Sequence, residues 1–289
     1  MLKRVIAGII GACIIFPVLW FSDTWVFPVF FAIVTLVSMF EMLRCIGIHK
    51  KFYVSIPLML FAAATPIVAR LTTVFRDIEG KDIDVIFILL CGAVIAVLWF
   101  FAVSLFSNGD FHLGTASMTF MTSFYIVGGY TAIVMLRDLG STGKFVFWLV
   151  FIGAWSTDIF AYFFGRLLGR HKLMPEISPK KTIAGSLFGV LFCIISYVVY
   201  GLILQYFAGI KPHYIVLALV AMLISVVAQV GDLVMSHIKR KYGIKDFGKI
   251  MPGHGGLLDR FDSVLAVALI LIVACEILNK FGILLFSEL

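Results

Sequence analysis

The chain contains nine apolar runs that are each long enough to cross a lipid bilayer. The hydrocarbon core of a bilayer is about 30 Å thick, so a helix needs roughly 20 apolar residues to cross it. The runs lie at about 4–21, 25–43, 52–74, 83–106, 115–136, 145–164, 183–207, 213–236 and 261–281. The sequence therefore predicts an all-α, polytopic membrane protein with about nine transmembrane helices.

The composition excludes a soluble protein of the same length. Of the 289 residues, 62% are hydrophobic and 13% are charged, whereas a soluble domain has about 25% charged and roughly 45–50% apolar residues. In water, a chain of this size could not bury so much apolar surface. This excludes a water-soluble enzyme, a disordered tail and a disulfide scaffold. The five cysteines form no CxxC pair and are predicted to pack as small hydrophobic residues.

The distribution of basic residues predicts how the chain is oriented. Lys and Arg are enriched in cytoplasmic loops, and most of the 23 Lys and Arg lie in segments that share one side if the N-terminus is inside. These segments lie near 3–4, 44–51, 166–181 and 239–260. We therefore expect an N-in/C-out, multi-pass protein of the cell (inner/plasma) membrane. Segment 107–114 departs from the pattern, because it carries Asp110 and no Lys or Arg. The same rule explains the net charge of +7, so no nucleic acid partner is expected.

Ionisable residues inside the spans divide the chain into two parts. Each one costs about 2.5–3.5 kcal/mol on insertion scales, so each needs a reason. Before residue 140 we interpret Glu41 and Arg70 as structural residues that snorkel from span ends. We therefore predict an N-terminal scaffold of five spans at 1–140, and a catalytic domain of four spans and two basic cytoplasmic loops at 141–289.

Two polar clusters lie inside spans of the second part. Asp158, Tyr162 and Arg166 share one face of a helix; a local pair between Asp158 and Arg166 is as well supported as a functional role. The second cluster is a stripe that consists of Ser225, Gln229, Asp232 and Ser236. Such a stripe either joins two helices or lines a water-filled site, and its acid favours the site.

A third cluster runs from the basic residues 239–241, through a Pro-Gly-His-Gly-Gly turn at 252–256, to Asp259 and Asp262. Glycines allow backbone N–H groups to approach an anion, and a helix N-terminus favours negative charge. Two acids three residues apart lie on one side of a helical turn, and their oxygens suit Mg²⁺. The cluster predicts metal-dependent phosphate chemistry. The alternative is a basic run that contacts anionic lipids, followed by acids that only cap a helix.

The same stretch resembles the signature of phosphatidate cytidylyltransferases. The matching positions are Ser236-x-Ile238-Lys239-Arg240-x4-Lys245-Asp246-x-Gly248 and Pro252-x-His254-Gly255-Gly256-Leu257-x-Asp259-Arg260-Phe261-Asp262. Met251 stands where the family usually has Leu, Ile or Phe, which is a volume-conserving change. Upstream, Asp158 with Gly165-Arg166, and the segment 177–182, also resemble the family.

The resemblance implies a membrane enzyme of phospholipid biosynthesis that condenses CTP with phosphatidate, giving CDP-diacylglycerol and pyrophosphate. It implies Mg²⁺ with a second, monovalent cation such as K⁺, and a homodimer. The predicted topology places both basic loops, and so the active site, on the cytoplasmic side. The implied metal-binding and catalytic acids are Asp232, Asp259 and Asp262, with Lys239 and Arg240 as catalytic cations. The implied substrate-binding residues are Asp158, Ser178, Lys180, Lys181, Lys245, His254, Gly255, Gly256 and Arg260. His254 is expected to bind rather than to move a proton, because a phosphate oxygen is already anionic at neutral pH.

Two other functions stay open at this point. A membrane transporter for anionic metabolites would use the same basic cavity without chemistry, although such proteins usually carry an internal repeat, which this sequence does not display. A cytidylyltransferase that acts on a different lipid phosphate would have the same signature, because lipid tails contact apolar helix faces that carry no readable code.

Overall fold

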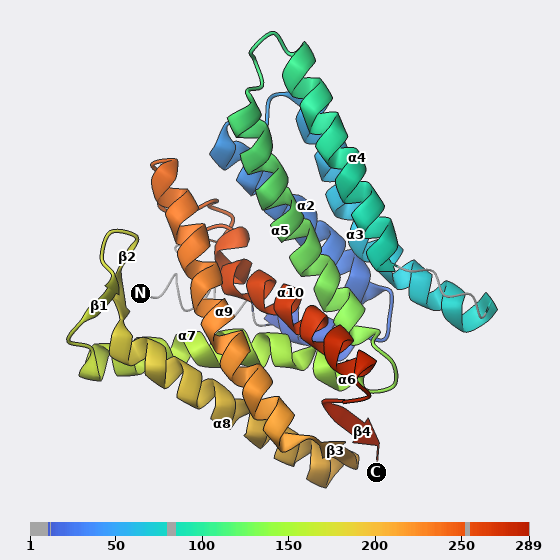
Figure 1. Cartoon of the computed structure of the whole chain (residues 1–289), viewed down its shortest axis with the longest axis vertical. Helices are drawn as coiled ribbons and strands as arrows, with labels where there is room; N and C mark the ends of the chain where they lie inside the picture. Colours follow the sequence, from blue (N-terminus) through green and yellow to red (C-terminus); the bar gives the residue numbers. More distant parts are fainter. Residues whose placement is uncertain (1–10, 12, 80–84, 252–254, 289) are drawn as a thin grey trace. The chain divides into compact units, whose positions relative to one another are not determined.

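The fold is helical, as the apolar runs predict. The structure is a computed structural model that describes residues 11, 13–79, 85–251 and 255–288. Within these residues there are nine helices (Figure 1): α2 (Val26–Ile46), α3 (Phe52–Glu79), α4 (Val85–Phe106), α5 (Leu113–Arg137), α6 (Gly143–Val146), α7 (Trp148–Leu168), α8 (Ile183–Ala208), α9 (Tyr214–Lys241) and α10 (Leu258–Lys280).

Seven of the nine predicted spans are confirmed as helices long and apolar enough to cross a membrane. They are Val26–Ile46, Phe52–Phe75, Leu113–Arg137, Gly143–Leu168, Ile183–Ala208, Tyr214–Lys241 and Leu258–Lys280. The fourth predicted span, at 83–106, corresponds to α4, whose described apolar part, Leu90–Phe106, is shorter than the other seven. Much of the first predicted span, at 4–21, lies outside the described residues, although 13–20 are helical.

Two small β-ladders were not predicted by the sequence analysis. Strand β1 (Lys172–Met174) pairs antiparallel with β2 (Ser178–Thr182), and β3 (Ile210–Pro212) pairs antiparallel with β4 (Phe286–Glu288). Strands of three to five residues are too short to display the alternation of apolar and polar residues on which a prediction depends. The β1–β2 hairpin affects the site, because β2 carries Lys181.

The described chain divides into two compact units. The first unit consists of Met1–Val134 together with Ile244–Asp259, and the second of Met135–Gly243 together with Arg260–Leu289. In the first unit α2 packs on α3, and in the second α8 packs against both α7 and α9. Segment 244–259, which carries part of the signature, therefore belongs to the N-terminal unit. The functional division at residue 140 stays a prediction.

The second unit is held together by very close packing of α7 on α8. A Cβ atom on Gly185 would overlap the carbonyl oxygen of Ala161 and would lie 3.0 Å from the Cα of Gly165. Close by, Phe164 stacks on Phe188 with ring centroids 4.3 Å apart. Small residues that allow helix backbones to approach are typical of helix pairs in membranes, where lipid is as apolar as the core. The glycines of these two helices thus set the spacing of the second unit.

Two connecting segments of the first unit are tied together by a charged contact. Lys51 Nζ lies 2.9 Å from Asp110 Oδ2 and also donates to the carbonyl oxygen of Asp110, and Tyr53 donates to the same carboxylate at 3.3 Å. The hydrogen bond and the charge of Lys51 lower the pKa of Asp110 below its usual value. Asp110, in the segment 107–114 that departs from the positive-inside pattern, therefore lies beside the basic segment that precedes α3.

Candidate active site

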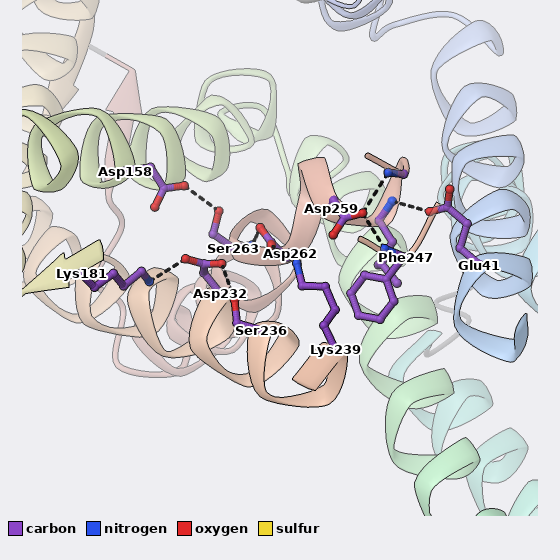
Figure 2. A network of polar contacts seen from close by, with 12 residues as sticks. Glu41, Asp158, Lys181, Asp232, Ser236, Lys239, Phe247, Asp259, Asp262 and Ser263 are labelled. Carbon is purple, nitrogen blue, oxygen red and sulfur yellow. Dashed lines mark hydrogen bonds and ion pairs between the residues drawn. The ribbon is translucent and has the colours of Figure 1, made fainter. Parts of the chain in front are cut away.

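Three carboxylates from three different helices face one another in the second unit (Figure 2). Asp158 comes from α7, Asp232 from α9 and Asp262 from α10. They lie close enough to interact electrostatically: Asp158 with Asp232, and Asp262 with both others. Like charges held this close within apolar helices need compensating cations. The cluster thus brings together two predicted metal ligands, Asp232 and Asp262, with the predicted substrate-binding Asp158.

Two lysines supply the compensating charge. Lys181 Nζ lies 2.6 Å from Asp232 Oδ2, and Lys239 Nζ lies 4.0 Å from Asp262 Oδ2. Lys181 lies in β2, directly before the final residue of the strand, Thr182. The side chain of Thr182 accepts the N–H of Gly185 and caps the start of α8. Because this N-cap fixes the start of the helix, it also fixes where the preceding lysine lies. Both lysines were predicted as site residues.

Lys239 is placed by a longer α9 than the sequence analysis predicted. The expected span ended at 236, whereas the helix continues to Lys241 and is followed by Gly243 at φ +66°. Cations in the last turn of a helix are favoured by the helix dipole, and glycine tolerates the left-handed conformation after it. Lys239 and Arg240 therefore belong to the helix itself. The side chain of Lys239 is buried, and Arg240 is exposed.

Two serine hydroxyls donate hydrogen bonds to two of the acids. Ser263 Oγ donates to Asp158 Oδ2 at 3.1 Å, and Ser236 Oγ donates to Asp232 Oδ1 at 3.4 Å. Ser263 was not predicted from the sequence, because a serine beside Asp262 in a helix has no distinguishing signal. Asp158 contacts α10 through this serine, and Arg166 is exposed at the end of α7.

The polar stripe of α9 joins helices at one end and carries an acid of the carboxylate cluster at the other. At one end, Ser225 accepts the hydroxyl of Thr157 at 2.9 Å, and Gln229 donates to the carbonyl oxygen of Ser186 at 3.3 Å. These hydrogen bonds join α9 to α7 and α8. At the other end, Asp232 belongs to the acidic cluster, and Ser236 donates a hydrogen bond to it. Only the second half of the stripe carries site residues.

In the first unit, Asp259 organises the glycine-rich segment. Its Oδ2 atom accepts the N–H of Phe247 at 2.8 Å and that of Gly256 at 2.9 Å. Gly255 adopts φ +93°, a conformation that residues with a Cβ rarely adopt. Asp259 is buried at the start of α10. Its bond from Gly256, just before the helix, agrees in part with the alternative in which the acids cap a helix. The predicted site residue His254 lies outside the described residues.

The other predicted substrate-binding residues lie mostly at the surface of their units. Lys180 and Arg260 are exposed in the second unit, and Lys245 is exposed in the first. Ser178 is half-buried on β2, where it pairs with Met174 of β1. Their predicted roles stay predictions.

Comparison with known proteins identifies the family. The sequence model of a group described as the cytidylyltransferase family matches residues 2–278. This chain belongs to the cytidylyltransferase family. It is 32% identical over 272 residues to the phosphatidate cytidylyltransferase of Bacillus subtilis (strain 168), covering 92% of this chain and 94% of that protein. It is 34% identical over 272 residues to the phosphatidate cytidylyltransferase of Staphylococcus haemolyticus (strain JCSC1435), covering 92% and 96%.

The metal predicted for this cytidylyltransferase can be tested against its donor atoms. Among the residues that the structure describes, no group of three or more His, Cys, Asp or Glu side chains is arranged to hold one metal ion. Mg²⁺, however, usually takes one or two protein carboxylates and leaves its other positions to water and phosphate. The hard oxygens of Asp232 and Asp262 fit that demand. The assignment of Asp259 as a third ligand stays a prediction.

One interpretation of the sequence is wrong. Glu41 does not snorkel from a span end, because its side chain is 1% exposed and it accepts backbone N–H groups of Leu257 and Leu258. The only sequence signal was a lone acid within an apolar run, which does not identify a partner more than 200 residues away. Arg70, by contrast, donates to the exposed carbonyl oxygen of Asp23.

Proposed function

We propose that this protein transfers the cytidylyl group of CTP to phosphatidate, giving CDP-diacylglycerol and pyrophosphate. The observation that carries the proposal is the cluster of Asp158, Asp232 and Asp262 with Lys181 and Lys239, set among apolar helices. Ionisable side chains within apolar helices are costly and rare, and where they gather they commonly mark a substrate or ion site. The names of the full-length relatives supply the substrates.

The reaction requires positioning and charge neutralisation more than acid–base chemistry. An anionic oxygen of the lipid phosphate attacks the α-phosphorus of CTP, a new P–O bond forms, and the bond to the β-phosphate oxygen breaks, which releases pyrophosphate. Lys181 and Lys239 neutralise phosphate oxygens and hold both substrates in line. The exposed cations Lys180, Arg240 and Arg260 of the second unit bind the triphosphate where it enters from the cytoplasm.

The proposed reaction uses Mg²⁺, which Asp232 and Asp262 would hold, with Asp259 as a further candidate. When bound, this ion neutralises phosphate oxygens and orients the leaving group. A second, monovalent cation such as K⁺ and a homodimeric assembly are part of the same proposal. Asp158, held by Ser263, lies beside the two acids and serves substrate binding.

The first test follows label from CTP into lipid. Purified protein in detergent is given phosphatidate, Mg²⁺ and CTP labelled at the α-phosphate, and the chloroform phase is counted. We expect labelled lipid, and we expect EDTA to abolish it, because without the metal ion the carboxylates repel the triphosphate instead of helping to bind it. Absence of label with every lipid phosphate and cation tested, from a folded protein that still binds CTP, would contradict the proposal and favour a transporter. If label entered only a different lipid phosphate, the reaction would be the same but the acceptor would not be phosphatidate.

We further propose that nine spans cross the cell membrane with the N-terminus inside and the C-terminus outside. The contact between Lys51 and Asp110 supports this topology, because it requires segments 47–51 and 107–112 to lie on one side. Under the positive-inside rule that side is the cytoplasm. The active site would then face the cytoplasm, where CTP is available.

Single cysteines test the orientation. In a background without the five free cysteines, Lys50→Cys and Asn108→Cys are expected to react with a membrane-impermeant maleimide only in inside-out vesicles, because both residues are exposed on the proposed inner side. Ser141→Cys, exposed between α5 and α6, is expected to react only in right-side-out vesicles. Reaction of Lys50→Cys and Asn108→Cys from opposite sides would exclude the topology.

A further inference from the structure

The first unit contains a buried acid whose partners are the backbone of the signature segment. Glu41, on α2 and labelled in Figure 2, accepts the N–H of Leu257 at 3.1 Å through Oε1 and the N–H of Leu258 at 2.9 Å through Oε2. Both donors are at the start of α10, where the first N–H groups of a helix have no partner within the helix. Each carboxylate oxygen of Glu41 therefore satisfies one orphan donor.

Two glycines of the segment leave room for this carboxylate. A Cβ on Gly248 would overlap Glu41 Oε1, and a Cβ on Gly256 would lie 2.5 Å from both of its oxygens. Real Cβ atoms do not approach other atoms this closely, so the backbone can surround the carboxylate only because both positions are glycine. Gly256 belongs to the turn that the sequence predicts to approach phosphate, and it also accommodates an acid from α2.

A second residue of α2 holds the other end of the segment. Arg44 Nη2 donates to the carbonyl oxygen of Phe247 at 2.9 Å, while the N–H of Phe247 donates to Asp259. Arg44 lies three residues after Glu41, on the same side of the helix. One helical turn of α2 thus anchors the segment at Phe247 and at Leu257–Leu258.

We propose that Glu41 is a positioning residue for cytidylyl transfer, acting through the start of α10. Its charge, not only its volume, holds the helix start that carries Asp259 and Arg260. An acid within a span costs about 2.5–3.5 kcal/mol on insertion scales, and the N–H donors together with the helix dipole offset that cost. The inference rests on the proposed function, because it names a residue that positions that same site.

The principal test is the isosteric substitution Glu41→Gln. Gln keeps the volume of Glu but has one acceptor oxygen, and its NH₂ group then faces a backbone N–H. We expect kcat of Glu41→Gln to fall about 10- to 100-fold, the scale of a small misplacement of reacting groups. We expect the kcat of Glu41→Ala to be lower still. If Glu41 only fills space, Glu41→Gln will have wild-type kcat, and that result would overturn the proposal.

Hydrogen exchange supplies a measurement that does not depend on activity. At least one of the amides of Leu257 and Leu258 is expected to exchange about tenfold faster in Glu41→Gln, because Gln leaves one of the two without an acceptor. Unchanged exchange would overturn the positioning role even if activity fell. If the wild type had no cytidylyl transfer, the proposed function would fail, while the exchange result would still decide whether Glu41 holds the segment.

Two further variants separate positioning from stability. Ser38→Ala removes a buried hydroxyl one turn earlier on α2, whose partner is Tyr130 at 2.9 Å, and is expected to leave kcat and the amides of α10 unchanged. Arg44→Gln changes an exposed residue, so it should fold even if Glu41→Gln does not. It is expected to speed exchange near Phe247 and to lower kcat about tenfold. Wild-type exchange and kcat in Arg44→Gln would contradict anchoring by α2.

Discussion

Asp232→Asn is expected to lower kcat for cytidylyl transfer by at least about 100-fold, the scale on which one preorganised charged contact contributes to catalysis. Asp232 is central to the cluster: it interacts electrostatically with Asp158 and Asp262 and forms the 2.6 Å ion pair with Lys181. Asn has the same shape and can still accept the hydroxyl of Ser236. The loss therefore measures charge, with little change in packing. Label transfer from α-labelled CTP and the thermal unfolding midpoint, measured on the same sample, check the prediction.

The matched control lies on the same stripe of α9. Ser225→Ala removes the hydroxyl that accepts from Thr157, two turns before Asp232, and touches no charged group of the cluster. We expect it to lower the unfolding midpoint slightly while kcat stays within about twofold, since a net hydrogen bond contributes only about 0.5–1.5 kcal/mol. Full activity in Asp232→Asn, or an equal loss of activity in Ser225→Ala, would remove Asp232 from its proposed role.

Gly185→Val is expected to have the largest effect on folding. The new Cβ would overlap the carbonyl oxygen of Ala161 and crowd the Cα of Gly165. Overpacking typically costs about 1–3 kcal/mol. Here the added Cβ meets backbone atoms, which cannot move aside as a flexible side chain can, so the two helices must separate. Separation of α7 from α8 would also displace Asp158 and Lys181. We expect a sharp fall in the yield of monodisperse protein and in its unfolding midpoint, with activity lost in proportion.

Gly114→Val is the control for a glycine whose replacement meets no obstacle. Gly114 lies at the start of α5, where an added Cβ has no atom within 4 Å. Its yield and unfolding midpoint are expected to stay close to those of the wild type. If both variants behaved alike, the α7–α8 contact would not be the feature that makes glycine necessary at position 185.

Most of the helical architecture could be predicted because the bilayer imposes one simple demand on the sequence. A spanning helix needs about 20 apolar residues, and a chain with 62% hydrophobic residues displays such runs directly. The predicted spans at 183–207 and 213–236 correspond to α8 and α9, although α9 extends to Lys241. The β1–β2 hairpin has no comparable signal, because its three- and five-residue strands are polar and short.

Most residues of the candidate site could be predicted from the sequence, but most of the contacts between them could not. Asp232 was found because charge within an apolar segment is rare and costly. Lys239 and Asp262 were found because they belong to the charged, glycine-rich signature segment. The pairing of Lys181 with Asp232, and of Ser263 with Asp158, joins residues 51 and 105 positions apart in the chain. No local pattern encodes such separations. Tertiary packing alone determines which charges meet.

By itself, the sequence determined that this chain is a membrane protein. It also determined the approximate positions of most helices along the chain and the motif that the chain shares with cytidylyltransferases. These properties are local, because each depends on residues within one helix or one loop. Only the tertiary structure decided that Glu41 holds the start of α10 and that the two lysines offset the acids. The reason is physical: a buried charge is stable only beside a specific partner, and that partner is found by folding.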